Sequence, residues 1–221
     1  MELTFLQKII LLALDDKGWF GTSEHKIKFG LAGAILFDLY KAGRIGFQND
    51  EVYIANAKST DNVVLDRVLN LIKSSKKQRS VRSWIQRIVY KKLLLRKTIL
   101  KQLINNKIIG REEYSLLMVF YQTKFPLSNV ELKRKLQENI YENIVSEKSL
   151  SDHDIMLLVV MNNCKMVRKN FGGFIQFLKM RRKINEITQF KTPRTEAEEV
   201  IKLLQTAISR AIMASNVSIH I

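Results

Sequence analysis

Hydrophobic residues recur at helical spacing along most of this chain. In residues 3–14 and 27–42, leucine, isoleucine, alanine and phenylalanine lie three to four positions apart, the period of one helix face. The same spacing returns from residue 59 onward, in segments that polar joints or glycines interrupt. Further helices are expected over residues 63–72, 80–88, 93–104, 127–145, 155–167, 174–187 and 195–212. The pattern therefore predicts an all-α, mainly helical fold.

Two segments depart from this period. Residues 44–47 and 51–54 alternate around a polar turn and predict a short β-hairpin. Residues 112–120 fit a helix or a strand, and the following residues fit a loop or a hairpin because Pro126 disfavours helix at the residue before it. No internal repeat or long linker divides the chain, so one domain over residues 1–221 is expected.

The basic residues are concentrated in two intervals that lack any acidic residue. Residues 67–111 hold fourteen lysines and arginines, and residues 155–185 hold seven more. Outside these intervals sixteen basic residues face twenty-one acidic ones, so the intervals account for the whole net charge of +16. Such clustering indicates a polyanionic partner, either nucleic acid or an anionic membrane surface. We expect the two intervals to converge on one exposed cationic surface.

A membrane surface requires clustered cations and a shallow apolar anchor. An apolar run follows the first basic interval: Leu116, Leu117, Met118, Val119, Phe120 and Tyr121. This run could equally be core or a contact between subunits of a homo-oligomer. No stretch reaches 18 apolar residues without charge, so any membrane contact is expected to be peripheral.

Nucleic acid is the alternative polyanion. Trp84 and Tyr90 fall partly on apolar helix faces, which does not favour base stacking. Residues 91–107 could serve as a recognition helix, although the pattern does not single them out. A third hypothesis is a protein–protein adaptor or scaffold that binds no lipid.

Catalytic and metal-binding motifs are not found in the sequence. Asp152 and Asp154 flank His153 before an apolar run, a pattern typical of a helix N-terminus. Asp15 and Asp16 are interpreted as helix-terminating residues. The single cysteine, Cys164, is interpreted as a small buried apolar residue and fits a reducing, cytoplasmic compartment. We therefore expect no enzyme, catalytic residue, metal or cofactor.

An ordered set of short motifs resembles the Golgi phosphoprotein 3 family. The set comprises LLALDDKG at 11–18, GLAGAIL at 30–36, GRI at 43–45, VLDRVL at 64–69, WI at 84–85, LINNKII at 103–109 and PLSN at 126–129. The resemblance implies a central helix bundle ringed by amphipathic helices. It also implies a basic face that binds phosphatidylinositol 4-phosphate, and a hairpin that touches the membrane or another subunit. Eukaryotic members are peripheral proteins on the cytosolic face of the Golgi.

The family's headgroup pocket is only partly matched. Its tryptophan falls on Ser23, its first arginine on Ala32, and its two later arginines on Leu93 and Arg96, so Arg96 alone is kept. This favours general binding of anionic lipid over strict headgroup specificity. The resemblance begins almost at Met1, so we expect a stand-alone member without the basic leader of eukaryotic members, such as a prokaryote could encode.

The resulting hypothesis is a non-catalytic peripheral membrane protein that binds anionic phospholipid or phosphoinositide. The predicted headgroup-binding residues are Arg96, Lys97, Lys92, Arg87, Arg82 and Trp19.

Overall fold

The computed structural model describes residues 2–20, 24–91, 94–116, 120–146, 149–189 and 192–217. Of the structure, 64% is helical, which confirms the predicted all-α class. The helices are α1 (Phe5–Ala13), α2 (Glu24–Lys41), α3 (Val63–Lys73), α4 (Val81–Tyr90), α5 (Leu95–Asn105), α6 (Val130–Val145), α7 (Asp152–Asn163), α8 (Val167–Asn170), α9 (Phe174–Thr188) and α10 (Glu196–Val217). Two antiparallel hairpins accompany them, β1 (Ile45–Gln48) with β2 (Glu51–Ile54) and β3 (Glu112–Leu116) with β4 (Phe120–Lys124).

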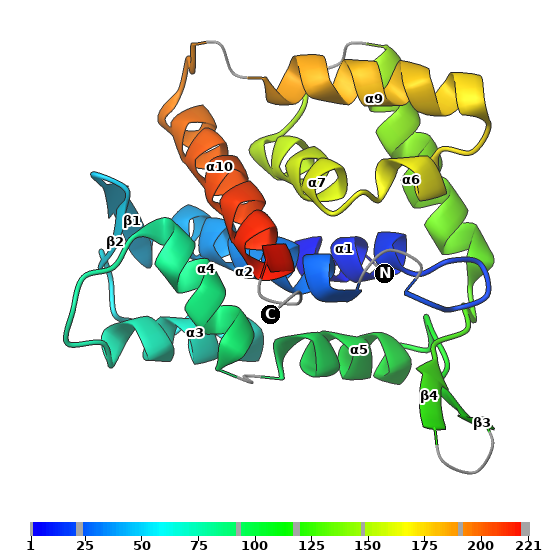
Figure 1. Cartoon of the computed structure of the whole chain (residues 1–221), viewed down its shortest axis with the longest axis horizontal. Coiled ribbons are helices and arrows are strands. Elements are labelled where there is room, and N and C mark those ends of the chain that lie inside the picture. The colour runs from blue at the N-terminus through cyan, green and yellow to red at the C-terminus, as the bar shows by residue number, and fades with distance from the viewer. Residues whose placement is uncertain are drawn as a thin grey trace.

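Helix α2 is the centre of the bundle. It contacts α1, α3, α4, α7 and α10, and Figure 1 shows it crossing behind α10. Two glycines permit this close packing. A Cβ on Gly30 would lie 2.6 Å from Cys164 Sγ, and one on Gly33 would lie 2.4 Å from Ile208 Cδ1. A central helix surrounded by amphipathic helices agrees with the expected arrangement.

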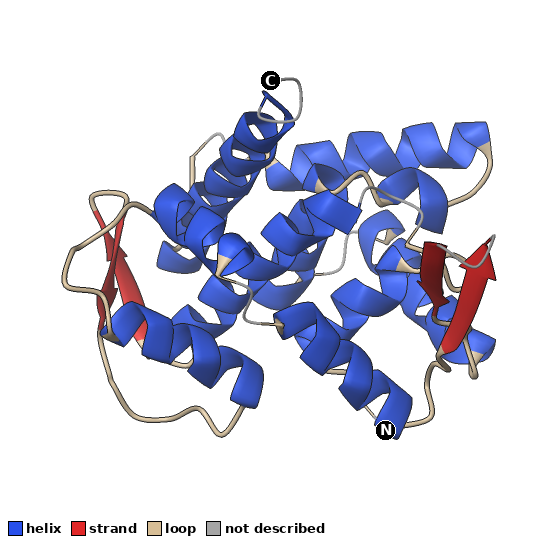
Figure 2. Ribbon diagram, turned by 60° about the horizontal axis from the view of Figure 1, so that its bottom comes forward, coloured by secondary structure: helices blue, strands red, loops and turns tan. Residues whose placement is uncertain are grey.

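Helix α4 is fixed against this centre by one apolar face. Val81, Trp84, Ile85 and Ile88 are each at most 2% exposed and follow the period of one helix face. Figure 2 shows the underside of the molecule, where α3 and α5 lie side by side and the two hairpins stand at opposite ends.

One predicted helix is interrupted. The expected helix over residues 155–167 ends at Asn163, and α8 begins only at Val167. Lys165 has a positive φ of 57°, and Met166 N donates to Met161 O at 2.8 Å, so a turn closes α7 before α8 begins. The hydrophobic period continues across the break because Met166 and Val167 return to the same core.

The described part of residues 112–120, for which the sequence fitted either a helix or a strand, belongs to the β3–β4 hairpin. Its register pairs Glu112 with Lys124 and Leu116 with Phe120. Residues 117–119, and the side chains of Leu116, Phe120 and Tyr121, lie outside the described part of the structure. The role of this apolar run as membrane anchor or subunit contact therefore stays a prediction. In Figure 1 the hairpin extends below the helices, on the same side as α5.

Candidate anion-binding site

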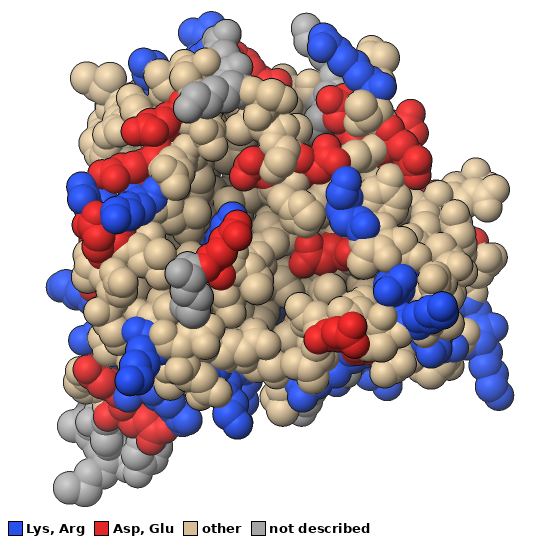
Figure 3. Space-filling view, turned by 180° about the vertical axis from the view of Figure 1, so that it is seen from behind, with Lys and Arg blue, Asp and Glu red and all other residues tan. Residues whose placement is uncertain are grey.

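Lysine and arginine side chains follow the underside of the molecule. Figure 3 shows them along the lower edge of the rear face, whereas aspartate and glutamate are more frequent above it. This edge carries α3, α4 and α5, which contain most of the first acid-free interval. Within the described part of that interval, ion pairs to carboxylates include those of Arg96 with Glu24 and Arg111 with Glu113. The interval itself supplies no carboxylate, so any counter-charge on this surface comes from other parts of the chain.

The part of the second basic interval that lies on α9 does not join this surface, contrary to expectation. Lys179 and Arg181 are exposed on α9, which lies at the top of Figure 1 while α5 lies at the bottom. In Figure 2, α9 and α5 again lie on separate sides of the molecule. The reason is topological, because α9 packs on α6, α7 and α8.

A cavity of about 280 Å³ opens where α2, α4 and α5 meet. We call it the Arg96 cavity, and its lining residues are Lys28, Leu31, Ile88, Val89, Leu94, Leu95, Arg96 and Lys97. Its walls are apolar, and its three charged side chains are all cations. Leu94 has a left-handed φ of 53° and provides no side-chain cap, so the first backbone N–H groups of α5 receive no capping oxygen from it.

Arg96 is held in place by two neighbours. Its guanidinium pairs with Glu24 in the first turn of α2 and lies 4.9 Å from the centroid of the Phe20 ring. The Arg96 side chain is 28% exposed and that of Glu24 is 50% exposed, so the pair remains open to solvent. Neither partner could be predicted from the sequence, since no local pattern links residues 20 and 24 to residue 96.

The other predicted headgroup residues are distributed over several surfaces. Lys97 is exposed and lines the Arg96 cavity. Arg82 is exposed on the first turn of α4, and Arg87 lines a separate hollow on another face of that helix. Lys92 lies outside the described residues. Thus Arg96 and Lys97 are the described members of the predicted set that share one cavity.

Trp19 lies near the hairpin instead of in the Arg96 cavity. Its ring centroid is 6.0 Å from that of Tyr114 on β3, while Phe20 contacts Arg96 and also packs 5.9 Å from Phe125. These two adjacent aromatic residues therefore link the hairpin to the cavity.

The turn that carries these aromatics is organised by Asp15. Its Oδ1 accepts hydrogen bonds from Lys17 N at 2.9 Å and Trp19 N at 2.8 Å, directly after α1 ends. This agrees with the helix-terminating role predicted for this residue. Gly18 O accepts from Phe125 N at 2.9 Å, which joins the turn to the end of β4.

Two lysines from distant helices hold the same turn. Lys133 Nζ donates to Leu14 O and to Asp16 Oδ1, each at 2.9 Å, and its side chain is 3% exposed. Lys169 Nζ donates to Ala13 O at 3.0 Å and to Trp19 O at 3.3 Å. Burial lowers the pKa of Lys169 from 10.5 to about 8. The nearby Lys133 also lowers this pKa, while Asp15 and Asp16 oppose the change.

The lowered pKa of Lys169 predicts that stability increases between pH 8 and 10.5. Below pH 8 the ammonium is charged in both states, and its desolvation penalty is present in full. Between these values the unfolded chain keeps a proton that the folded chain releases, so the free energy of unfolding increases. We expect wild type to gain about 1 to 2 kcal/mol over Lys169→Met between pH 7 and pH 10, a value reduced for solvent screening. Urea unfolding at both pH values measures this gain, and a pH-independent difference would contradict it.

The family pocket positions are only partly described. Ser23 and Leu93 lie outside the described residues, and Ala32 is fully buried in α2. Position 32 therefore contributes no charge to a surface site. Lys28, one helical turn earlier, lines the Arg96 cavity instead.

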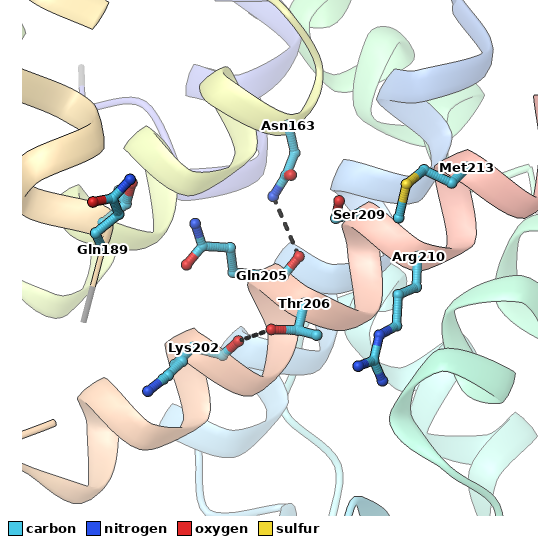
Figure 4. Close-up of a pocket in the computed structure, with 9 residues that line it drawn as sticks. Asn163, Gln189, Lys202, Gln205, Thr206, Ser209, Arg210 and Met213 are labelled. Carbon is cyan, nitrogen blue, oxygen red and sulfur yellow. Dashed lines mark hydrogen bonds between the residues drawn. The ribbon is translucent and has the colours of Figure 1, made fainter. Parts of the chain in front are cut away.

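A larger hollow of about 570 Å³ lies between the ends of α7 and α9 and the side of α10. Asn163 Nδ2 donates to Gln205 O at 3.5 Å across it. Figure 4 shows that Lys202 and Arg210 extend from α10 in different directions, with Arg210 directed away from Asn163. Its two cations do not converge, so this hollow is a weaker anion site than the Arg96 cavity.

The residues considered for catalysis have structural roles. Ser151 and Asp154 form a capping box at the start of α7, and His153 Nε2 lies 3.0 Å from Asp38 Oδ1. Cys164 is fully buried, which raises the pKa of its thiol to about 12, so the thiol is protonated at neutral pH. Among the described residues, no cluster of histidine, cysteine and carboxylate side chains could hold a metal ion.

No helix in the described part of the chain is both long enough and apolar enough to cross a bilayer.

Comparison with known proteins supports the resemblance seen in the sequence. The family described as Golgi phosphoprotein 3 (GPP34) matches residues 6–208. Vacuolar protein sorting-associated protein 74 of Schizosaccharomyces pombe is 25% identical over 167 residues, which cover 66% of this chain and 49% of that protein. The chain thus spans about half the length of this curated relative. Because the family match extends over most of its residues, the chain belongs to the Golgi phosphoprotein 3 family.

Proposed function

We propose that this chain is a non-catalytic peripheral membrane protein that binds anionic phospholipid, with the headgroup at the Arg96 cavity. The observation that carries the proposal is the composition of that cavity. Lys28, Arg96 and Lys97 surround apolar walls from α2, α4 and α5. An amphiphile with an anionic group needs both features, since its phosphate requires cations and its glycerol and acyl carbons require apolar contact.

The start of α5 adds to the attraction for an anion. Arg96 and Lys97 occupy its first turn, where the helix dipole is positive and cations are unfavourable. An anionic group bound there would accept hydrogen bonds from backbone N–H groups of this first turn and from both side chains. Glu24 is the carboxylate that pairs with Arg96, and a headgroup phosphate would compete with it for that guanidinium.

The position of the β3–β4 hairpin fits docking on a flat surface. Figure 1 shows that it extends on the same side of the molecule as α5, which carries Arg96 and Lys97. A hairpin tip inserted beside the bound headgroup would combine a shallow apolar anchor with electrostatic attraction. The same tip could instead contact a second copy of the chain, and the two roles are compatible.

The proposed location is the cytoplasmic face of a membrane, which in a eukaryotic cell would be the Golgi. The matched relative is named as associated with vacuolar protein sorting, and lipid binding would suit a role in membrane traffic. Phosphatidylinositol 4-phosphate is one anionic lipid that the family resemblance suggests.

Neutralising the cavity cations is expected to weaken membrane binding about thirtyfold. The variant combines Arg96→Gln with Lys97→Gln, and each cation near an anionic leaflet contributes roughly 1 kcal/mol. Flotation with phosphatidylcholine vesicles containing phosphatidylserine or phosphatidylinositol 4-phosphate measures the change. Binding should also decrease with added salt, because exposed charges are screened within about 10 Å at 0.1 M.

The matched control combines Lys179→Gln with Arg181→Gln on α9, which removes the same net charge from exposed side chains away from the cavity. It should bind vesicles like wild type. Equal weakening of both variants would reject the cavity as the site. Duplex DNA binding with no vesicle binding would instead favour the nucleic-acid alternative.

Glu24→Gln tests the competition directly. It releases Arg96 from its ion pair while leaving the cavity residues intact. Vesicle affinity should rise about two- to fivefold, the range expected for an exposed ion pair. A decrease would mean that Glu24 positions Arg96 for the lipid instead of competing with it.

A further inference from the structure

A second basic hollow, of about 430 Å³, lies on a different face of α4 from the Arg96 cavity. We call it the Arg87 cavity, and its lining residues are Arg79, Ser83, Gln86, Arg87, Tyr90 and Lys91. Four of them have the spacing of one helix face, at positions 83, 86, 87 and 90. This face is distinct from the core face that contains Trp84 and Ile88.

The turn that carries Arg79 and leads into α4 is fixed by the β1–β2 hairpin. Val52 N donates to Arg79 O at 3.2 Å, and Val81 N donates to Asp50 O at 2.8 Å. Arg79 Nε also donates to Ser75 Oγ at 3.4 Å. Because α4 is in turn anchored by the buried Trp84, the cavity is preformed and rests on rigid elements.

The charge in the Arg87 cavity is not compensated by the residues that line it. Three cations line it, and no carboxylate does. Arg87 Nε is covered from solvent and has no hydrogen-bond partner among the residues that the structure describes. A covered guanidinium edge without an acceptor is unfavourable. An anion that enters from the open side of the cavity would supply the counter-charge that the lining residues lack.

The lining specifies the chemistry of the occupant. Apart from the Tyr90 ring and the side-chain stems, every lining group is polar, which distinguishes this cavity from the apolar walls around Arg96. Two guanidinium groups match the oxygens of a phosphate, and the hydroxyls of Ser83 and Tyr90 can donate to the oxygens that remain. A phosphate monoester, with close to two negative charges, fits three cations better than a diester does.

We propose that the Arg87 cavity is a second anion site, which binds a phosphate monoester group. The group could belong to a phosphoinositide headgroup at the membrane or to a soluble phosphorylated compound. The proposal is independent of lipid binding at Arg96, because the two cavities share no residue.

The test uses Arg79→Gln combined with Arg87→Gln, with Lys179→Gln and Arg181→Gln as the charge-matched control. Titration with inorganic phosphate, followed by calorimetry, should show binding weakened at least about tenfold in the first variant and within twofold of wild type in the control. The variant Arg96→Gln with Lys97→Gln should also keep its phosphate affinity, which separates this site from the proposed lipid site. Equal losses in all variants would overturn the proposal.

A second measurement on wild-type protein does not depend on the variants folding. The covered Nε–H of Arg87 should exchange slowly with water and give its own ¹⁵N-correlated NMR signal. Saturable phosphate-dependent shifts of this signal and of the Tyr90 amide are expected, and their absence would overturn the proposal.

Vesicles distinguish the two sources of phosphate. If the Arg79/Arg87 variant loses affinity for vesicles with phosphatidylinositol 4-phosphate but keeps it for phosphatidylserine, the site binds the headgroup monoester. If it loses only inorganic phosphate and soluble inositol 1,4-bisphosphate, the source is a soluble compound. Either result supports a phosphate site.

Discussion

Gly18→Ala is expected to destabilise the protein by at least about 3 kcal/mol. Gly18 has a φ of +84°, and a Cβ there would lie 2.4 Å from the carbonyl carbon of Phe125 and 2.6 Å from Pro126 N. These are backbone atoms, so no side-chain rotation can relieve the overlap. The turn would have to leave the end of β4, which would break the hydrogen bond from Phe125 N to Gly18 O. Thermal unfolding should show a decrease in Tm of about 6 to 12 °C.

Two other glycines serve as controls for this substitution. Gly43 has a φ of +64°, and a Cβ there would meet no described atom within 4 Å, so Gly43→Ala should cost only the backbone strain, about 1 kcal/mol. Gly172 has neither a positive φ nor a close neighbour among the described atoms, and Gly172→Ala should be nearly neutral. If Gly18→Ala lowers the free energy of unfolding no more than Gly43→Ala does, Gly18 is not in close contact with the backbone of Phe125 and Pro126.

The positions of most helices could be predicted because their signals are local. Gly43 follows α2 in the left-handed conformation, and a glycine directly after a hydrophobic run is a local signal for a helix end. Ser151 and Asp154 form the cap that the order of polar and apolar residues indicated. Thr195 Oγ1 likewise accepts from Glu198 N at the start of α10, while the Glu198 carboxylate accepts from Arg194 N. Capping and hydrophobic periodicity involve residues within about four positions of each other, so a single sequence is enough to reveal both signals.

The candidate site was only partly predictable because it depends on distant contacts. Arg96 was identified from charge density together with the family resemblance, and Lys97 from charge density; the structure brings both to one cavity with Lys28. The separation of α9 from the cationic underside follows from helix packing, which charge counting does not include. Phe20 and Glu24 contact Arg96 across more than 70 residues of sequence, with no local signal.

The turn of residues 14–20 connects fold stability to the proposed function. It places Phe20 against Arg96 and Trp19 against Tyr114 of the hairpin. Its own position is set by lysines of α6 and α8 and by the backbone of Phe125, directly after β4. A change that releases the turn should therefore disturb the headgroup cavity and the hairpin together, whereas a change at the cavity alone should leave stability nearly unchanged.

Lys133→Ala is expected to cost about 3 kcal/mol, although a lysine in an amphipathic helix suggests an exposed side chain. The Lys133 side chain is 3% exposed, and its Nζ donates to the carbonyl of Leu14 at the end of α1. Truncation leaves a cavity and an unsatisfied carbonyl, and each of these is unfavourable. Lys133→Met should cost less, about 1 kcal/mol, because it fills the space and avoids burying an ammonium group.

Asp16→Ala separates the two hydrogen bonds of Lys133. The Asp16 side chain is 89% exposed, so its carboxylate stays hydrated and its ion pair with Lys133 should contribute little. Urea unfolding of both single variants and of the double variant measures the coupling between them. A cost for Asp16→Ala equal to that of Lys133→Ala would mean that the carboxylate, and not the end of α1, is the partner for which the ammonium is buried.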